Sequence, residues 1–185
     1  SKPEPTATSK PEPTAIPKPE PPATPKPEPP ATPLPLLTAI DQEDLALVKR
    51  HMAMGTDPNS GPILQGFPFE GAFPLHLAVI KDNSEIVQVL LENGAQIDIK
   101  AENSDEATPL HWAAFYSMEN MVLFLIDKGA SINVLDANGA SPTDSANYAK
   151  VLNQGNPETL HKLNSIIEIL KSNGGLSAEE LNRLS

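Results

Sequence analysis

The chain has 185 residues, no cysteine and a formal net charge of −11, from 13 Lys plus Arg against 24 Asp plus Glu. This length suits one domain, and without cysteine there is no disulfide scaffold, thiolate nucleophile or cysteine-based zinc site. The acidic charge repels nucleic-acid phosphate, which excludes a nucleic-acid-binding protein and favours a basic or uncharged protein partner.

The first 35 residues form a segment of their own. Residues 2–33 are four copies of an eight-residue unit that begins Lys-Pro-Glu-Pro, and residues 1–35 hold 14 of the 21 prolines and no net charge. Because proline fixes φ and keeps each preceding residue extended, we expect a disordered, polyproline-II-like spacer. P-x-x-P spacings such as Pro22 to Pro25 leave a second interpretation open, a ligand for an SH3-like groove.

In composition the spacer resembles the stiff segments of bacterial envelope proteins that bridge the periplasm. This resemblance implies a periplasmic or cell-envelope location, with the cytoplasm as the alternative. At about 3.1 Å per residue, a fully extended spacer could hold a domain roughly 100 Å from an anchor or surface. No apolar run approaches the roughly 18 residues of a membrane-spanning helix, so no direct membrane span is expected.

Two segments of the remaining chain, residues 73–99 and 108–134, align without gaps. Three pairs of matching residues lie 35 positions apart: Pro74 and Pro109, His76 and His111, and Gly94 and Gly129. In each segment Pro suits a first helical position, a short Ala-rich helix and a turn follow, and a Leu-rich helix ends at Gly. Each segment is therefore predicted to be a pair of helices.

Both segments follow the pattern T-P-L-H-x-A-A and then V-x-x-L-L-x-x-G-A-x-x-N, and they resemble the ankyrin-repeat family. The resemblance implies an all-α solenoid of stacked helix-turn-helix units with hairpin fingers, here about three repeats and an N-terminal capping unit. Stacking would bury a ribbon of apolar side chains that no single unit could bury. The expected domain, residues 36–185, divides into a capping unit (36–59), a long finger (60–71), two repeats (72–101 and 102–135), a divergent repeat with an insertion (136–175) and a closing helix (176–185).

The divergent repeat departs from the family pattern in two ways. Thr143 and Asp144 replace the Leu-His of the motif. Its second helix begins after an Asn156 cap and runs to a Gly stop about 12 residues later than in the pattern. Beyond it, the spacing of Ser177 and Glu180 is typical of a capping box and predicts the short closing helix.

An enzyme would need a nucleophile, an acid–base pair or a metal cluster. The resemblance implies that His76 and His111 each tie a helix to the neighbouring finger by hydrogen bonds, and this role is favoured over metal binding. The stretch of Glu102, Asp105 and Glu106 lacks the D-x-D-x-D-G spacing of a calcium loop, so a solvated turn is favoured. With no HExxH, G-x-S-x-G or phosphate-binding glycine loop, we expect no enzyme, no cofactor and no metal.

Aromatic residues are scarce, with one Trp, two Tyr and five Phe in the whole chain. Trp112 and Phe124 fall at helix positions expected to pack, and Phe73, which replaces the usual Thr, is assigned to local packing. The resemblance implies that the residues after each Ala pair face a concave groove: Ile80 and Lys81, Phe115 and Tyr116, and Tyr148 and Ala149. Finger residues beside that groove complete the predicted protein-binding surface: Phe69, Glu70, Ser104, Asp105, Ala137 and Asn138.

Surface aromatics bury large areas at a small cost in rotamer entropy, as a protein interface requires. The leading hypothesis is a non-catalytic, monomeric protein–protein interaction module whose acidic, aromatic concave face binds a folded partner with a basic or apolar surface. Its specific version is an inhibitor or immunity protein for an enzyme, and the alternative is a structural tether that positions a complex through the spacer. A competing interpretation of the site is that Phe115 and Tyr116 pack under the long finger or under the 149–157 insertion.

Overall fold

Nine helices occupy the part of the chain that the structure, a computed structural model, describes, residues 33–184. They are α1 (Pro33–Asp41), α2 (Leu45–Ala53), α3 (Pro74–Ile80), α4 (Ser84–Glu92), α5 (Pro109–Phe115), α6 (Glu119–Asp127), α7 (Pro142–Leu152), α8 (Pro157–Ser172) and α9 (Ala178–Leu184). No β-strand occurs within this range, which confirms the all-α prediction. The predicted spacer and its P-x-x-P motifs lie outside the described residues, except for residues 33–35.

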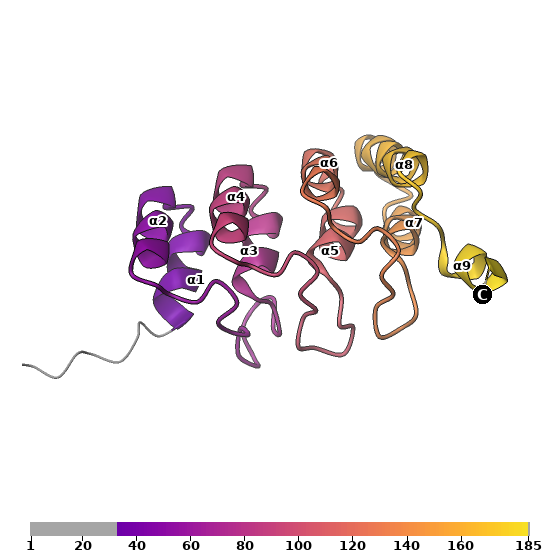
Figure 1. Cartoon of the computed structure of the whole chain (residues 1–185). Helices are drawn as coiled ribbons and strands as arrows, with labels where there is room; N and C mark the ends of the chain where they lie inside the picture. Colours follow the sequence, from indigo (N-terminus) through magenta and orange to yellow (C-terminus); the bar gives the residue numbers. More distant parts are fainter. Residues whose placement is uncertain (1–32, 185) are drawn as a thin grey trace, which may run out of the picture.

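The first eight helices stand as four pairs in one row (Figure 1). We call α1, α3, α5 and α7 the inner layer, and α2, α4, α6 and α8 the outer layer. Neighbouring inner helices contact one another along the whole row, and the connections between pairs project on one side as fingers. This arrangement is the predicted solenoid, with a capping pair followed by three further pairs.

The first helix begins earlier than expected. α1 starts at Pro33 and so includes two prolines, Pro33 and Pro35, within its first turn. Proline is tolerated there because the first backbone N–H groups of a helix have no intrahelical acceptor. α1 therefore begins three residues before residue 36, where the sequence predicts that the solenoid starts.

Two histidines hold successive pairs together as predicted. His76 Nδ1 accepts a hydrogen bond from the Phe73 N–H (3.3 Å) at the start of α3, and its Nε2 lies 3.0 Å from the carbonyl oxygen of Ala107 in the next finger. His111 repeats both contacts, with the Thr108 N–H (3.2 Å) and with the Ala140 carbonyl oxygen (3.1 Å). Because Nδ1 accepts from an N–H, the ring proton is on Nε2, which donates to the carbonyl.

The turns after the outer helices form a second set of ties between neighbouring pairs. Asn59 Nδ2 donates to the Gly94 carbonyl (2.9 Å) and Asn59 Oδ1 accepts from the Gln96 N–H (2.8 Å), 35 and 37 residues away. Asn133 repeats this pattern further along, with the Gly174 carbonyl (3.0 Å) and the Leu176 N–H (2.8 Å). The capping pair is thus joined to its neighbour by the same contact that joins the second regular repeat to the divergent unit, whereas between the two regular repeats Asp98 only accepts a hydrogen bond, from the Ser131 N–H (2.9 Å).

The insertion in the divergent unit lengthens both of its helices. α7 has 11 residues where α5 has 7, and α8 has 16 where α6 has 9. Asn156 caps α8 as predicted, because its side chain accepts from the Thr159 N–H at 3.1 Å. The extra residues therefore extend the stack, and residues 149–152 form the last turn of α7.

Asp144 takes the position of the motif histidine and forms a different tie. Its Oδ2 accepts from the N–H (3.0 Å) and hydroxyl (2.9 Å) of Ser141, and from the N–H of Ala178 (2.7 Å) at the start of α9. The predicted capping box is also present, since Ser177 N–H donates to Glu180 (2.8 Å) and Ser177 Oγ accepts in return (3.2 Å). An acceptor on α7 therefore meets a donor on the closing helix.

The core is one continuous apolar ribbon through all four pairs. Leu75 and Leu110, at equivalent motif positions, are fully buried, and so are large side chains from every pair: Leu36, Ile40, Ile86, Leu90, Met121, Leu125, Leu163, Ile166 and Leu170. The divergent unit has Thr143 at this motif position, equally buried, and its Oγ1 makes no hydrogen bond within residues 33–184. The ribbon thus contains one buried, unpaired hydroxyl where its neighbours have Leu.

Candidate protein-binding groove

A cavity of about 940 Å³ opens between the fingers and the inner helices α5 and α7. Three fingers and the two helices contribute its lining: Phe69, Glu70, Asn103, Asp105, Ala107, His111, Trp112, Phe115, Tyr116, Asp136, Asn138, Ala140, Asp144, Ser145 and Tyr148. We call this cavity the groove. Its size lies within the range of sites that bury most of a bound group.

Five aromatic rings follow one another along the groove. Ring centroids are 6.3 Å apart for Phe69 and Trp112, 6.4 Å for Trp112 and Tyr116, 5.2 Å for Tyr116 and Phe115, and 6.2 Å for Phe115 and Tyr148. These spacings match favourable aromatic pairs, so the rings support one another without being covered. Tyr116 keeps 45% of its surface exposed and Tyr148 keeps 60%. This aromatic row holds five of the eight aromatic residues in the chain.

Carboxylates from the fingers and from α7 line the same groove. Glu70 accepts from the Gly66 N–H (3.1 Å), Asp105 from Asn138 Nδ2 (3.3 Å), and Asp136 from the N–H groups of Asn138 and Ala140 (2.8 Å each). With Asp144 there are four such groups, and all of these hydrogen bonds come from neutral donors. No Lys or Arg lines the groove, and none of the four forms an ion pair within the described residues.

Most of the predicted binding residues come together here. Seven of them line the groove: Phe69, Glu70, Asp105, Phe115, Tyr116, Asn138 and Tyr148. Four others do not: Ile80, Lys81, Ser104 and Ala137. Lys81 instead pairs with Asp41 of α1 at 2.7 Å, because the capping pair places a carboxylate beside it. Ala149 is fully buried, since the longer α7 turns it toward the core, so its predicted place in the groove is wrong.

The sequence places Trp112 at a helix position expected to pack, but its half-buried ring is part of the aromatic row, between Phe69 and Tyr116. One face contacts His76 (centroids 4.8 Å apart), and the long finger brings Phe69 against it. The sequence did contain an indication that Trp112 could lie at the surface. It occupies the variable position after the motif histidine, where the preceding repeat has the buried Leu77.

The packing-only interpretation of Phe115 and Tyr116 does not match these contacts. The long finger reaches Trp112 through Phe69, and no ring contact joins Phe69 to Phe115 or Tyr116 within the described residues. Of the predicted 149–157 insertion, residues 149–152 continue α7, residues 153–156 form the turn to α8, and none lines the groove beside the two rings. Tyr116 therefore remains open to solvent at the groove surface.

The two motif histidines are fixed in the neutral state. Burial lowers the pKa of His76 to about 4, although the hydrogen bond to the Ala107 carbonyl partly opposes this shift. Burial also lowers the pKa of His111, against the opposing effect of its bond to the Ala140 carbonyl. Both nitrogens of each ring are already in hydrogen bonds, which assigns both side chains to holding repeats together.

The groups that could hold a metal ion, and the apolar character of the helices, bear on two other kinds of function. Within residues 33–184, no three His, Cys, Asp or Glu side chains are grouped so that they could hold a metal ion. The acidic finger residues instead form a turn, in which Asn103 Oδ1 accepts from the N–H groups of Asp105 and Glu106 (3.1 Å each). Over the same range, no helix has the length and apolar character needed to cross a bilayer.

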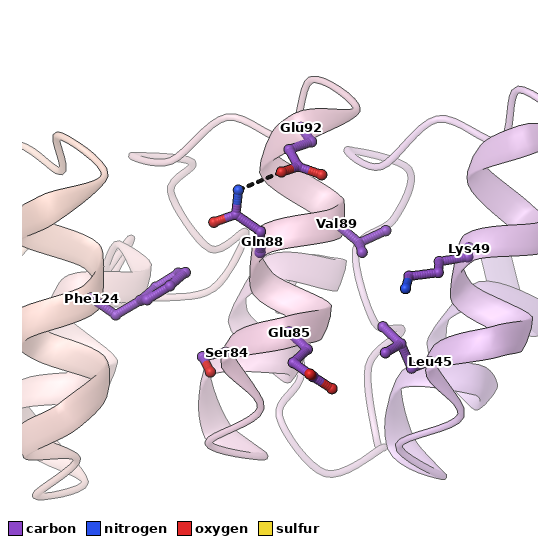
Figure 2. Close-up of a pocket in the computed structure, with 8 residues that line it drawn as sticks. All are labelled: Leu45, Lys49, Ser84, Glu85, Gln88, Val89, Glu92 and Phe124. Carbon is purple, nitrogen blue, oxygen red and sulfur yellow. Dashed lines mark hydrogen bonds between the residues drawn. The ribbon is translucent and has the colours of Figure 1, made fainter.

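A shallower hollow of about 390 Å³ lies on the outer layer (Figure 2). Phe124 of α6 borders it on one side and Lys49 of α2 on the other, with Glu85 and Glu92 of α4 between them. Phe124 is half-buried, and Lys128 Nζ lies 5.1 Å from its ring centroid. No predicted binding residue lines this hollow, so substitutions in it are suitable controls for substitutions in the groove.

Helix pairs stacked in one row, with fingers locked by histidine, define the class of helical-repeat solenoids. A family model described as ankyrin repeats, in three copies, matches residues 36–136, more than half of the chain. The chain belongs to the ankyrin-repeat family. No curated protein matches it. Ankyrin repeats generally mediate protein–protein interactions, and the family is typically non-catalytic.

Proposed function

We propose that this protein is a non-catalytic interaction module that binds a folded protein partner in its groove. The observation that carries the proposal is the aromatic row, because five rings from a finger and two inner helices converge on one open cavity. Protein interfaces are enriched in such aromatic side chains, and a few of them carry most of the binding energy.

The rigidity of the groove supports the same function. Its helices are joined by buried hydrogen bonds, and its fingers are held by backbone contacts such as the Ala137 N–H to the Asp105 carbonyl (2.8 Å). A preformed surface loses little conformational freedom on binding, so more of the contact energy appears as affinity.

The test is a capture experiment with the full chain and with a variant that carries Phe115→Ala and Tyr116→Ala. We expect the double variant to lose about 2 to 4 kcal/mol of affinity for the partner, because these rings are hot-spot candidates. The matched control is Leu123→Ala, which removes a comparably exposed apolar side chain from the outer layer. A partner retained by the control and lost by the double variant identifies the groove ligand.

Thermal unfolding distinguishes binding from folding in this test. The double variant should keep its midpoint within a few degrees, since Tyr116 is half exposed and Phe115 only partly buried. A lower midpoint with intact capture would contradict the proposal, because the two rings would then be structural.

The effect of the chain on the activity of its partner distinguishes an inhibitor from a tether. As an inhibitor or immunity protein, the chain would block an enzyme by occupying its surface, and purified partner activity should fall as the chain is added. As a tether, it would leave activity unchanged, and deleting residues 1–32 would alter only where the complex is located. We propose the cell envelope as that location, on the composition of the Lys-Pro-Glu-Pro repeats.

A further inference from the structure

The groove combines two kinds of side chain, aromatic rings and carboxylates, that together favour a particular kind of ligand. Its aromatic rings come from the first finger, from α5 with the following Tyr116, and from α7, while the three fingers supply the carboxylates Glu70, Asp105 and Asp136. One oxygen of each of these three carboxylates makes no hydrogen bond within residues 33–184: Glu70 Oε1, Asp105 Oδ2 and Asp136 Oδ2. The groove therefore combines negative charge that is not neutralised with exposed π faces.

A cation interacts favourably with the aromatic rings and with the carboxylates at the same time. The faces of aromatic rings attract cations, and carboxylates that lack a cationic partner gain from a charge-assisted hydrogen bond. Among protein side chains, the guanidinium of arginine is planar, so it can stack on a ring while its edge donates two parallel hydrogen bonds to a carboxylate. The ammonium of lysine is a compact point charge and makes neither contact as well.

We propose that the groove binds an arginine side chain of a protein partner, with the guanidinium between the aromatic row and the finger carboxylates. This inference rests on the proposed function and specifies the chemistry that the partner must present. The occupant is a loop or an extended segment that runs across the fingers, since the aromatic row spans several repeats. Charge complementarity supports this choice, because no Lys or Arg among residues 33–184 lines the cavity.

The chain contains its own reporter for this test. Trp112 is the only tryptophan, and its indole forms part of the aromatic row. The probe is a peptide of alternating Arg and Gly, titrated against the full chain while Trp112 fluorescence is recorded. The matched peptide replaces every Arg by citrulline, which keeps the planar shape but has no charge. We expect saturable quenching by the Arg peptide, with at least tenfold weaker binding of the citrulline peptide.

Matched variants distinguish the contribution of the groove carboxylates to binding from that of the overall negative charge of the chain. Glu70→Gln with Asp105→Asn removes two groove charges, and Glu85→Gln with Glu92→Gln removes two from the hollow of Figure 2. We expect the groove pair to weaken Arg-peptide binding about tenfold and the outer pair to change it less than twofold. For the rings, Tyr116→Leu should weaken binding by a similar factor, whereas Phe67→Leu, an exposed finger residue outside the groove, should not.

Three outcomes would overturn the inference: equal loss from both charge pairs, equal affinity for the citrulline peptide or for a matched peptide with Lys in place of every Arg, or no saturable binding at millimolar concentration. Its failure can be distinguished from failure of the proposed function. If Phe115→Ala with Tyr116→Ala abolishes partner capture while Glu70→Gln with Asp105→Asn does not, the groove binds a partner without an arginine. If none of these variants affects capture, the proposed function itself is wrong.

Discussion

The two regular repeats and the divergent last unit make the same kind of junction with opposite chemistry. In the regular repeats a buried histidine donates from Nε2 to a carbonyl of the next finger. In the last unit, Asp144 accepts from the N–H at the start of α9. The difference follows from what comes next, because a finger presents a carbonyl and a helix start presents unpaired N–H groups. The side chain at this motif position is therefore a donor where a carbonyl follows and an acceptor where N–H groups follow.

The largest effect should come from placing the wrong chemistry in a regular junction. His111→Asp would put a carboxylate opposite the Ala140 carbonyl, in a buried site where two acceptors repel each other. We expect a loss of about 3 kcal/mol or more in the free energy of unfolding, measured by urea denaturation. Because His111→Asn is uncharged, it should cost clearly less. Equal losses would show that shape, not charge, decides this junction.

Acid should weaken the histidine junctions next. The pKa of His76 is about 4 in the folded chain and near 6.5 when unfolded, so between these values the unfolded state binds more protons. Stability from this residue is therefore complete above about pH 6.5, and about 2 kcal/mol of it is lost by pH 5. The measurement is the free energy of unfolding at several pH values for the parent chain and for His76→Asn.

The variant His76→Asn should be less stable at neutral pH but should lose less stability between about pH 6.5 and pH 5. His111, whose pKa burial also lowers, contributes in the same direction in both proteins. Parallel pH curves for the parent and the variant would contradict the assignment of a neutral, buried His76.

The reverse substitution in the last unit should have a smaller and more local effect. In Asp144→His, a ring nitrogen can still accept from the Ser141 N–H, but its Nε2–H donor would face the Ala178 N–H donor. We expect a loss of about 1 to 2 kcal/mol and faster amide hydrogen exchange confined to residues 177–184. Asp127→His, at an exposed site on α6, is the matched control. Faster exchange throughout α7 and α8 would mean that Asp144 supports the whole unit.

The smallest expected effect is an increase in stability from a substitution at Thr143. Thr143 occupies the Leu position of the motif with a buried hydroxyl that has no hydrogen bond within the described residues. Thr143→Val keeps the shape and removes that group, so we expect a stabilisation of about 1 kcal/mol in thermal or urea unfolding. Thr108→Val is the control, since the Thr108 hydroxyl lies 2.7 Å from His111 Nδ1 and its loss should destabilise. A destabilised Thr143→Val would indicate that the hydroxyl has a partner, such as a buried water.

The sequence could predict helix starts that depend on local chemistry. The Pro and His of the motif lie three residues or fewer apart, so the helix start that they form depends only on the local backbone. The Asn156 cap and the box of Ser177 and Glu180 were predictable for the same reason. Repetition at a spacing of 35 residues then specifies that such units stack, because each one exposes an apolar face that only another unit can cover.

What the sequence could not predict depends on contacts between distant residues. The 12-residue delay before the last Gly stop fits either an inserted loop or longer helices equally well, and packing of α7 and α8 on the preceding pair decided for longer helices. Trp112 was assigned to the core because its helical position suits burial, but Phe69, 43 positions earlier, packs against it only through the fold of the long finger.

The sequence by itself determined the family and the helix pairs, since these follow from a repeated local pattern, and seven of the twelve residues that it predicts at the concave surface line the groove. Tertiary structure alone decided that five aromatic rings form one row and that three finger carboxylates line the same groove with no ion pair to any residue of 33–184. The physical reason is that ring contacts and charge balance depend on distances across repeats. Those distances are set by stacking and by finger conformation, which no single repeat encodes.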